Sequence, residues 1–306
     1  MSEENGQKRC GFTALIGPTN AGKSTLLNSL IGAKIAIVTH KVQTTRARLR
    51  GICIEGDTQI IFVDTPGIFK PKRKLDEAMV EAAWSGAGDA DTIVLVIDAN
   101  RGIEEDVENI FKQLSKQSRK CILVLNKIDL LPREKLLELA QRCNQGFPFD
   151  ATFMISALNG DGINDLRTHL AGLMPVSPWH YPDDQIADVS VRQMAAEITR
   201  EKVFLRLHQE LPYASTVETT RWKKLRDGSI RIEQEIFVER KSQRVIVLGE
   251  KGRTIKKIGE LARAEIQESL GIKAHLFLFV KVREKWTQDP ERYSEMGLNF
   301  PGKKKK

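Results

Sequence analysis

The sequence predicts an α/β protein with two domains: a mostly parallel, doubly wound sheet, then a smaller α+β domain. Three observations favour this organisation. A glycine-rich loop separates an apolar strand from a helix near the N-terminus, apolar strands then alternate with amphipathic helices, and a proline-rich stretch precedes a basic C-terminal third. A chain of 306 residues suits two domains, and a hydrophobic content of 41% is enough for two cores.

The first predicted element surrounds the glycine-rich loop at residues 17–24, which fits the P-loop pattern G-x-x-x-x-G-K-[ST]. Residues 12–16 have the composition of a buried strand, and apolar residues recur at helical spacing over residues 26–31. Glycines let the backbone approach a phosphate, while successive N–H groups and the helix N-terminus form an anion site. This context predicts that the whole loop binds nucleotide phosphates: Gly17, Pro18, Thr19, Asn20, Ala21, Gly22, Lys23, Ser24 and Thr25.

Side chains of this loop and of the segment after it predict a magnesium site. We expect Lys23 to bridge the β- and γ-phosphates and to assist catalysis, and the Ser24 hydroxyl to bind Mg²⁺. A threonine hydroxyl between the P-loop and the second strand can complete the coordination and sense the γ-phosphate. Thr45, beside Arg46, is the preferred candidate for this catalytic and metal-binding role, and Thr44 is the alternative.

An apolar strand at residues 59–64 delivers Asp64 to its C-terminal end, where open α/β sheets bind ligands. We expect Asp64 to meet Mg²⁺ through water. The Gly67 N–H can bind the γ-phosphate, so that loss of this phosphate releases the loop. The basic residues 70–74 either face phosphate or are simply solvated. The predicted nucleotide contacts in this segment are Asp64, Thr65, Pro66, Gly67 and Ile68.

Strands at residues 92–98 and 120–125 precede the tetrapeptide Asn-Lys-Ile-Asp at residues 126–129. This tetrapeptide indicates which base is bound. The Asp129 carboxylate can accept both N1–H and the N2 amine of guanine, whereas adenine would leave this carboxylate unpaired. Asn126 can tie its loop to the P-loop, and the Lys127 stem can cover the base. A last strand at residues 151–157 ends in a Ser-Ala pair whose second N–H suits guanine O6. The predicted base contacts are Asn126, Lys127, Ile128, Asp129, Ser156 and Ala157.

Amphipathic helices at residues 105–117 and 133–143 alternate with these strands, which predicts helices on both faces of the sheet. The four ordered motifs resemble those of translation-factor-related GTPases, and Asn20 with residues 44–46 narrow the resemblance to the TrmE–Era group. The resemblance implies a GTPase that converts GTP to GDP with Mg²⁺. Potassium-dependent members of the group further imply that Asn20 assists catalysis by holding K⁺ against the phosphates. Ile68 stands where Ras-like enzymes place a water-orienting glutamine, so catalysis needs another device.

A proline-rich stretch at residues 173–184 predicts a semi-rigid linker. We therefore assign residues 1–174 to the first domain, 175–184 to the linker, 185–300 to the second domain and 301–306 to a basic tail. The second domain is predicted to contain a helix at residues 191–211, strands at 215–220, 230–238 and 243–248, a helix at 253–269 and a strand at 274–282.

A Gly-x-x-Gly loop lies between the third of these strands and the basic helix after it. Glycines at this place let the backbone press against a nucleic-acid backbone. The predicted RNA contacts are Gly249, Glu250, Lys251, Gly252, Arg253, Lys256 and Lys257. The module resembles the type II KH domain of the Era family, and the two resemblances cover nearly the whole chain. They imply binding to small-subunit (16S) ribosomal RNA near its 3′ end, a role in maturation of the 30S subunit, and peripheral contact with the inner membrane.

Charge and cysteine usage narrow the class of partner and the compartment. Residues 1–184 carry a net charge of −1 and residues 185–306 one of +9, which favours a polyanionic partner for the second domain. The four cysteines show no metal-binding spacing, and the N-terminal residues do not resemble a signal peptide. No apolar run is long enough to span a bilayer. We expect a cytoplasmic protein with reduced thiols and no obligate oligomer.

Two other functions remain open from the sequence. A metabolic P-loop kinase or ATPase would have no guanine loop, so residues 126–129 argue against it. An RNA-binding scaffold with little turnover would use GTP only for folding, and multiple-turnover phosphate release distinguishes it from a GTPase. The lysines of residues 303–306 either add attraction for phosphate or are only solvated.

Overall fold

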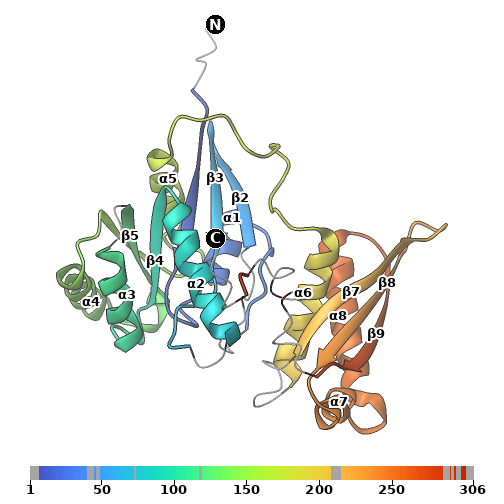
Figure 1. Cartoon of the computed structure of the whole chain (residues 1–306). Helices are drawn as coiled ribbons and strands as arrows, with labels where there is room; N and C mark the ends of the chain where they lie inside the picture. The colour runs from blue at the N-terminus through green and yellow to red at the C-terminus, as the bar shows by residue number, and fades with distance from the viewer. Residues whose placement is uncertain are drawn as a thin grey trace, which may run out of the picture. The chain divides into compact units, whose positions relative to one another are not determined.

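The computed structural model describes residues 7–39, 45, 49–71, 74–116, 119–207, 215–284, 290, 293 and 298–300. These residues form two compact units joined near residue 188 (Figure 1). The first unit contains the glycine-rich loop and the base-recognition tetrapeptide, and the second contains the Gly-x-x-Gly loop. Each unit is described by itself.

The first unit is built on a six-stranded sheet of order β2-β3-β1-β4-β5-β6. β2 runs antiparallel to β3, and the other neighbours pair in parallel. Because the parallel strands end at one edge of the sheet, the loops that follow them meet there. The strands are β1 (Arg9–Ile16), β2 (Leu49–Glu55), β3 (Thr58–Asp64), β4 (Thr92–Asp98), β5 (Lys120–Asn126) and β6 (Ala151–Ile155).

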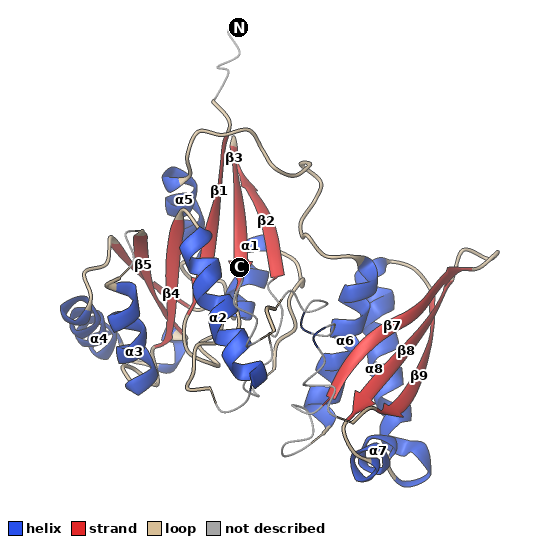
Figure 2. Ribbon diagram, in the orientation of Figure 1, coloured by secondary structure: helices blue, strands red, loops and turns tan. Residues whose placement is uncertain are grey.

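Helices cover both faces of this sheet (Figure 2). Side chains alternate along each strand, so Leu15 packs into the core under α1 (Lys23–Ile31) and α5 (Ile163–Leu173). Its neighbours Ala14 and Ile16 pack into the core on the other face, under α2 (Lys74–Asp89), α3 (Glu105–Leu114) and α4 (Arg133–Gly146). The predicted doubly wound fold is confirmed. The sequence patterns did not predict β2, α2 or α5, and α3 ends earlier than expected.

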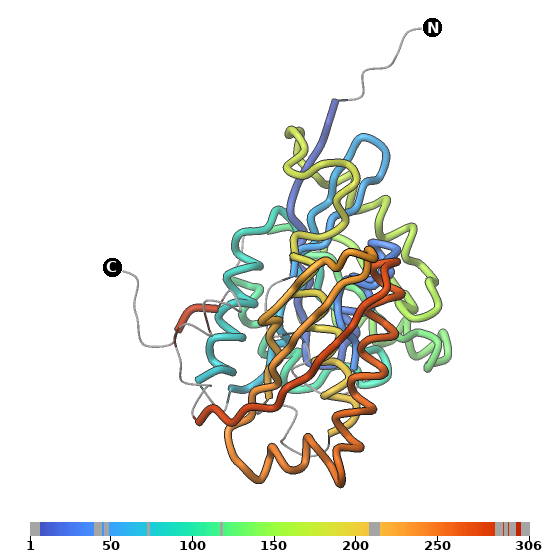
Figure 3. Tube along the Cα trace, turned by 90° about the vertical axis from the view of Figure 1, so that its right-hand side faces the viewer, coloured from blue at the N-terminus to red at the C-terminus, as the bar shows by residue number. Residues whose placement is uncertain are grey.

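The second unit has a three-stranded sheet of order β7-β8-β9, whose strands lie side by side in Figure 3. Helices pack against this sheet through two apolar clusters. β7 and β8 are antiparallel, and β8 and β9 are parallel because the α7–α8 crossover connects them. The predicted helix at residues 191–211 ends at Arg206, and residues 208–211 lie outside the described part. The elements are α6 (Val191–Arg206), β7 (Ser215–Lys224), β8 (Ile230–Val238), α7 (Lys241–Leu248), α8 (Arg253–Leu270) and β9 (Ala274–Val282).

The prediction of a strand at residues 243–248 is wrong, because this segment lies in helix α7. A four-residue apolar run cannot by itself distinguish a strand from a helix. The Gln243 side chain accepts the N–H groups of Glu239 and Arg240 at 2.8 and 3.0 Å, which starts a helix directly after β8. Within the apolar run Val247 is fully buried, whereas Val245 is 67% exposed, so burial follows one face of a helix.

The segment after α5 is hydrogen-bonded along the first unit rather than extended into solvent. Gln59 of β3 holds it from the sheet: its Oε1 accepts the N–H groups of His180 and Tyr181 at 2.9 and 3.1 Å, and its Nε2 donates to the Tyr181 carbonyl at 2.8 Å. Further along, the Ile52 N–H of β2 donates to Ile186 at 2.9 Å. These contacts restrain the predicted linker, while its assigned bounds remain a prediction.

Candidate functional site

The glycine-rich loop after β1 has a backbone that requires its glycines. Gly17 has φ +148, and a Cβ there would lie 2.2 Å from the carbonyl oxygen of Val96. Gly22 has φ +94, and a Cβ there would lie 2.2 Å from the Asn126 amide nitrogen. Asn20 also adopts a left-handed conformation, with φ 62. The loop therefore turns tightly against β4 and β5 and leads directly into α1.

The Lys23 side chain folds back into this loop. Its ammonium donates to the carbonyls of Gly17 and Pro18 at 3.0 and 2.8 Å, and the residue is 6% exposed. Burial lowers the pKa of Lys23 to about 8, and the nearby Asp64 carboxylate partly opposes this shift. A cation thus lies buried where phosphates are expected to bind.

The three residues predicted to bind magnesium lie together. The Ser24 hydroxyl is 2.9 Å from that of Thr45 and donates to Asp64 Oδ2 at 2.8 Å, and the Thr45 hydroxyl donates to the same oxygen at 3.3 Å. Asp64 is fully buried, and burial raises the pKa of its carboxyl while Lys23 lowers it. Its Oδ1 atom has no hydrogen-bond partner among the described residues. The alternative Thr44 lies outside the described residues.

The segment after β3 contacts the glycine-rich loop through its backbone. The buried Thr65 hydroxyl donates to the Leu15 carbonyl at 2.8 Å, so this side chain joins β3 to β1 rather than facing a ligand. Pro66 is buried beside Gly67, and a Cβ on Gly67 would lie 2.8 Å from Thr19 Cγ2. The Ile68 N–H donates to Gly17 at 3.0 Å, and its side chain is packed in the core. Ile68 therefore cannot orient a water with its side chain.

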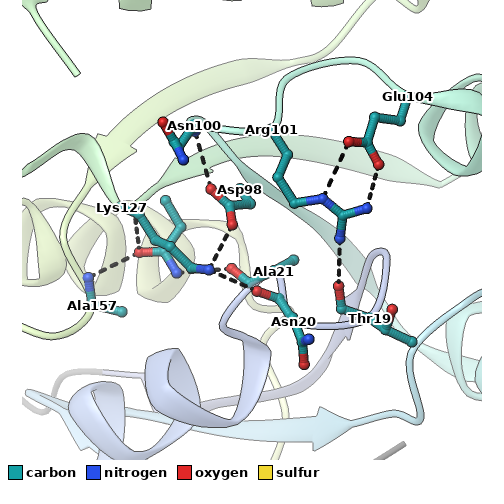
Figure 4. Close-up of polar contacts among 10 residues, drawn as sticks. Thr19, Asn20, Ala21, Asp98, Asn100, Arg101, Glu104, Lys127 and Ala157 are labelled. Carbon is teal, nitrogen blue, oxygen red and sulfur yellow. Dashed lines mark hydrogen bonds and ion pairs between the residues drawn. The ribbon is translucent and has the colours of Figure 1, made fainter. Parts of the chain in front are cut away.

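Asn126 at the end of β5 connects three loops. Its Nδ2 donates to the Ala21 carbonyl at 2.9 Å, and its Oδ1 accepts the N–H groups of Lys127 and Ala157 at 2.8 and 3.0 Å (Figure 4). The predicted tie to the P-loop is present. The Ala157 N–H, expected to face guanine O6, already has an acceptor in this structure, and a bound base would have to share it.

Asp129 presents an exposed carboxylate beside this junction. The buried Ser156 hydroxyl donates to its Oδ1 atom at 2.6 Å, which fixes the orientation of the carboxylate. Ile128 begins a short 3₁₀ turn and packs partly against the core. Thr25 lies half-buried in the first turn of α1. All predicted base and phosphate contacts thus gather at the carboxyl edge of the sheet.

Two residues of this site were not identified from the sequence. Asp98 ends β4, and its Oδ2 accepts the Lys127 ammonium at 2.6 Å. Arg101, in the following turn, donates to the Thr19 carbonyl at 3.4 Å and pairs with Glu104. The sequence offered one indication for Asp98: like Asp64, it is an aspartate at the end of a buried strand. No motif surrounds Asp98 or Arg101, so neither was singled out.

In the second unit, the Gly-x-x-Gly loop joins α7 to α8 in a sharp left-handed turn. Gly249 has φ 71, and a Cβ there would lie 2.2 Å from Thr254 Oγ1. Lys251 and Gly252 have φ 49 and 76, and the Gly252 N–H donates to the Gly249 carbonyl at 3.1 Å. The glycines are therefore needed for the turn itself as well as for any approach of a ligand.

The surface around this turn is basic, with an apolar strip beside it. The predicted contacts Glu250, Lys251, Arg253, Lys256 and Lys257 are all exposed. Lys257 pairs with Glu260 at 3.3 Å, a solvent-exposed contact that leaves the charge accessible. Sequence analysis did not identify two exposed apolar residues on α7 as surface groups: Val245 is 67% and Ile246 56% exposed.

Comparison with known proteins agrees with this geometry. The family model for 50S ribosome-binding GTPases matches residues 12–127, and that for KH domains matches residues 210–287. GTPase Era of Brucella suis biovar 1 (strain 1330) is 62% identical over 295 residues, which are 96% of this chain and 95% of that protein. The chain belongs to the Era family of GTPases. The resemblance to the Era family inferred from the motifs is therefore confirmed.

Two solved structures of Era share the fold over nearly the whole chain. Era in complex with MgGDPNP and nucleotides 1506–1542 of 16S ribosomal RNA has a TM-score of 0.90 at 36% identity, and the match covers 95% of this chain and 99% of that one. A variant of Aquifex aeolicus Era bound to GDP.AlF4⁻ also has a TM-score of 0.90 at 36% identity, with 94% and 99% covered.

Other features of this Era-family chain are structural. Cys10, Cys53, Cys121 and Cys143 are buried free thiols, and burial raises the pKa of Cys121 to about 12 and of Cys143 to about 11. Thiols with such pKa values are poor nucleophiles at neutral pH. Within the described part of the chain, every helix is too short or too polar to cross a bilayer.

Proposed function

We propose that this protein is a GTP-hydrolysing switch that binds small-subunit ribosomal RNA near its 3′ end and assists maturation of the 30S subunit. The observation that carries the proposal is the convergence of Ser24, Thr45 and Asp64 beside the buried Lys23, with Asp129 held at the same edge of the sheet. The solved structures of Era with MgGDPNP and ribosomal RNA, and with GDP.AlF4⁻, support the same assignment.

The residues present fit a magnesium ion. Asp64 Oδ1 is buried without a hydrogen-bond partner among the described residues, and oxygen ligands with bound water are what Mg²⁺ prefers. Ser24, Thr45 and Asp64 would hold the ion, and Lys23 would add its charge from the P-loop. When bound, the ion neutralises charge on the β- and γ-phosphate oxygens.

Potassium is proposed as a second cation, bound with the help of Asn20. The buried apolar side chain of Ile68 cannot replace the missing glutamine, so charge that develops on the phosphates needs another stabiliser. We expect phosphate release to be faster in potassium than in sodium, and Asn20→Gly to remove the difference. Glycine is the better substitution here, because it accepts the φ of 62 without strain. Equal rates of the unsubstituted protein in the two salts would contradict a role for potassium.

The Gly-x-x-Gly surface is the proposed RNA site. Its exposed cations, Lys251, Arg253, Lys256 and Lys257, suit the phosphate backbone. Val245 and Ile246 on α7 add an apolar strip on which unstacked bases can pack. A turn of glycines beside cations and an apolar strip favours a single-stranded segment over a duplex.

Crosslinking of the protein to RNA in cells, followed by sequencing of the bound fragments, tests the RNA assignment. We expect enrichment of fragments from the 3′ end of the small-subunit RNA. Crosslinks spread over total RNA in proportion to its abundance would contradict the assignment and leave only a GTPase.

A cytoplasmic location with peripheral contact at the inner membrane is also proposed, on the family resemblance and the basic second domain alone. Cosedimentation with anionic vesicles measures it. Binding that 0.5 M salt does not weaken, or the absence of binding at low salt, would contradict an electrostatic contact, because exposed charges are screened within roughly 3–10 Å at 0.1–1 M salt.

A further inference from the structure

Three consecutive carbonyls of the P-loop are each held from outside the loop. The Thr19 carbonyl accepts the Arg101 guanidinium at 3.4 Å, the Asn20 carbonyl accepts the Lys127 ammonium at 2.9 Å, and the Ala21 carbonyl accepts the Asn126 amide at 2.9 Å (Figure 4). We call these three contacts the carbonyl clamp. Two of its donors belong to the base-recognition tetrapeptide, whereas Arg101 belongs to the turn after β4.

The carbonyl clamp determines where the loop's N–H groups point. In a planar trans peptide, the C=O of one residue and the N–H of the next point in opposite directions. Holding the carbonyls of residues 19–21 outward therefore turns the N–H groups of Asn20, Ala21 and Gly22 away from the clamp, toward the side where phosphates are expected. The clamp thus preorganises the anion site before a nucleotide arrives.

Asp98 is the anchor of the central contact. Its Oδ2 accepts the Lys127 ammonium at 2.6 Å, its Oδ1 accepts the Asn100 N–H at 3.0 Å, and its side chain is 10% exposed. Lys127 has φ 66, a conformation that a lysine rarely adopts without other contacts to hold it. Asp98 and the Asn20 carbonyl together fix the ammonium in place.

We propose that Asp98 and Arg101 are positioning residues for nucleotide binding: they act through Lys127 and the Thr19 carbonyl on the phosphate-facing backbone. This inference rests on the proposed function, in which residues 17–24 bind the phosphates. It adds the end of β4 as a further segment that shapes the site, alongside the P-loop, the segment after β3 and the two base-binding loops.

The test measures the affinity of the full chain for GDP and for IDP, which lacks the N2 amine of guanine. Asp98→Ala should weaken the binding of both nucleotides by the same factor of roughly tenfold, since the ion pair that holds the Lys127 ammonium at the Asn20 carbonyl is lost. Asp98→Asn should recover part of the loss, because its single amide oxygen can still accept one of the two bonds, that from the Lys127 ammonium. Arg101→Ala should weaken binding less, about threefold, because its contact is longer and exposed.

A matched control lies at the other end of the same strand. Asp91 precedes β4, and its Oδ2 accepts the Phe12 N–H at 2.8 Å, so Asp91→Ala removes a similar bond far from the P-loop. It should change melting temperature but not nucleotide affinity. Calorimetric stoichiometry keeps the two effects apart, since unfolding lowers the number of binding sites and leaves the affinity of the remaining sites intact.

Three outcomes would overturn the inference. Unchanged GDP affinity in Asp98→Ala would make Asp98 a structural residue only. A change in the ratio of GDP to IDP affinity would mean that Asp98 acts on the base and not on the phosphates. A wild-type protein that bound no GDP would overturn the proposed function as well, which separates that failure from the other two.

Discussion

At the scale of single residues, the proposed guanine site is held together by a few side chains that each make several hydrogen bonds. Asn126 bonds to the P-loop, to its own loop and to the loop after β6. Ser156 is buried and directs Asp129, which itself remains exposed. We therefore expect base recognition to depend on one accessible carboxylate on a rigid support, so that a substitution of Asp129 tests it directly.

Asp129→Asn should shift the preference of the protein from guanine toward xanthine nucleotides. The new amide would donate where guanine also donates, whereas xanthine has a carbonyl there that can accept. Competition between GDP and XDP for the full chain measures the shift. Asp150→Asn is the control, because Asp150 accepts the Cys121 N–H at 2.7 Å at the opposite end of β5. Full retention of guanine preference would contradict the role of Asp129.

The lowered pKa of Lys23 predicts that GDP affinity falls as pH rises above about 8. In the nucleotide-free protein Lys23 loses its proton near this pH, whereas bound phosphates favour the charged form and raise its pKa. Binding in this range therefore takes up a proton, and affinity can fall by at most about tenfold per pH unit.

Calorimetry in two buffers of different ionisation enthalpy measures this proton uptake. We expect uptake at pH 8.5 and none at pH 6.5, where Lys23 is charged in both states. The stability of the nucleotide-free protein should change in the opposite direction. A lowered pKa means that the unfolded chain binds more protons between about 8 and 10.5, so Lys23 makes the fold more stable as pH rises there. Equal uptake at both pH values would contradict a buried, shifted Lys23.

At the scale of elements, strand prediction succeeded where the pattern was a long apolar run. β4 and β9 have the predicted ends because each is bounded by polar residues on both sides, and β5 runs one residue further than predicted, to Asn126. β2 was missed because it is an edge strand with only three consecutive buried residues between partly exposed ends. α2 was missed because its buried face is made largely of alanine and glycine, which carry little hydrophobic signal. The clustering of Ser24, Thr45 and Asp64 followed from motif order alone, whereas Asp98 needed the fold.

The turn between α7 and α8 yields a prediction for the RNA site. Gly252→Asp should abolish RNA binding and leave GTP affinity intact, since it adds bulk and negative charge where a phosphate is expected. The substitution is tolerable for the fold, because Asp accepts a left-handed conformation better than most residues and the nearest atom to a new Cβ is Ile255 Cγ2 at 4.0 Å.

Gly252→Asn is the matched control, with the same size and conformational tolerance but no charge. Fluorescence anisotropy with a labelled RNA at fixed salt compares the two variants. A larger loss for Asp than for Asn indicates repulsion by the added charge, and a similar loss for both indicates that bulk alone blocks the approach. RNA affinity that survived both substitutions would reduce the Gly-x-x-Gly loop to a turn.

At the scale of the whole molecule, the sequence joins a nearly neutral nucleotide domain to a strongly basic one. If the two sites are coupled, linkage requires that GTP and RNA strengthen each other's binding by the same factor. We expect RNA affinity to be higher with a non-hydrolysable GTP analogue than with GDP, by roughly five- to a hundredfold for a typical coupling. The same anisotropy assay measures the ratio of the two affinities.

Thr45→Ala should lower this ratio toward one without abolishing RNA binding. The Thr45 hydroxyl contacts Ser24 and Asp64, so its loss removes a group proposed to sense the γ-phosphate through Mg²⁺. Thr220→Ala is the matched control, because it makes the same change of side chain at an exposed residue. Ser215→Ala is less suitable because Ser215 is buried. Equal RNA affinities in the two nucleotide states of the wild type would mean two independent binding domains.

The segment that Gln59 holds against the first unit also bears on aggregation during synthesis of the chain. β2 is an edge strand, and its outer side is covered where Ile52 bonds to Ile186 and Arg50 accepts the N–H of Asp188 at 3.0 Å. An uncovered edge strand is a template for pairing with other chains. Because synthesis proceeds from the N-terminus, this edge is complete long before its cover emerges from the ribosome. The chain therefore has an uncovered sheet edge until residues 186–188 have been made, and the cover that ends this risk comes from the connection to the second domain.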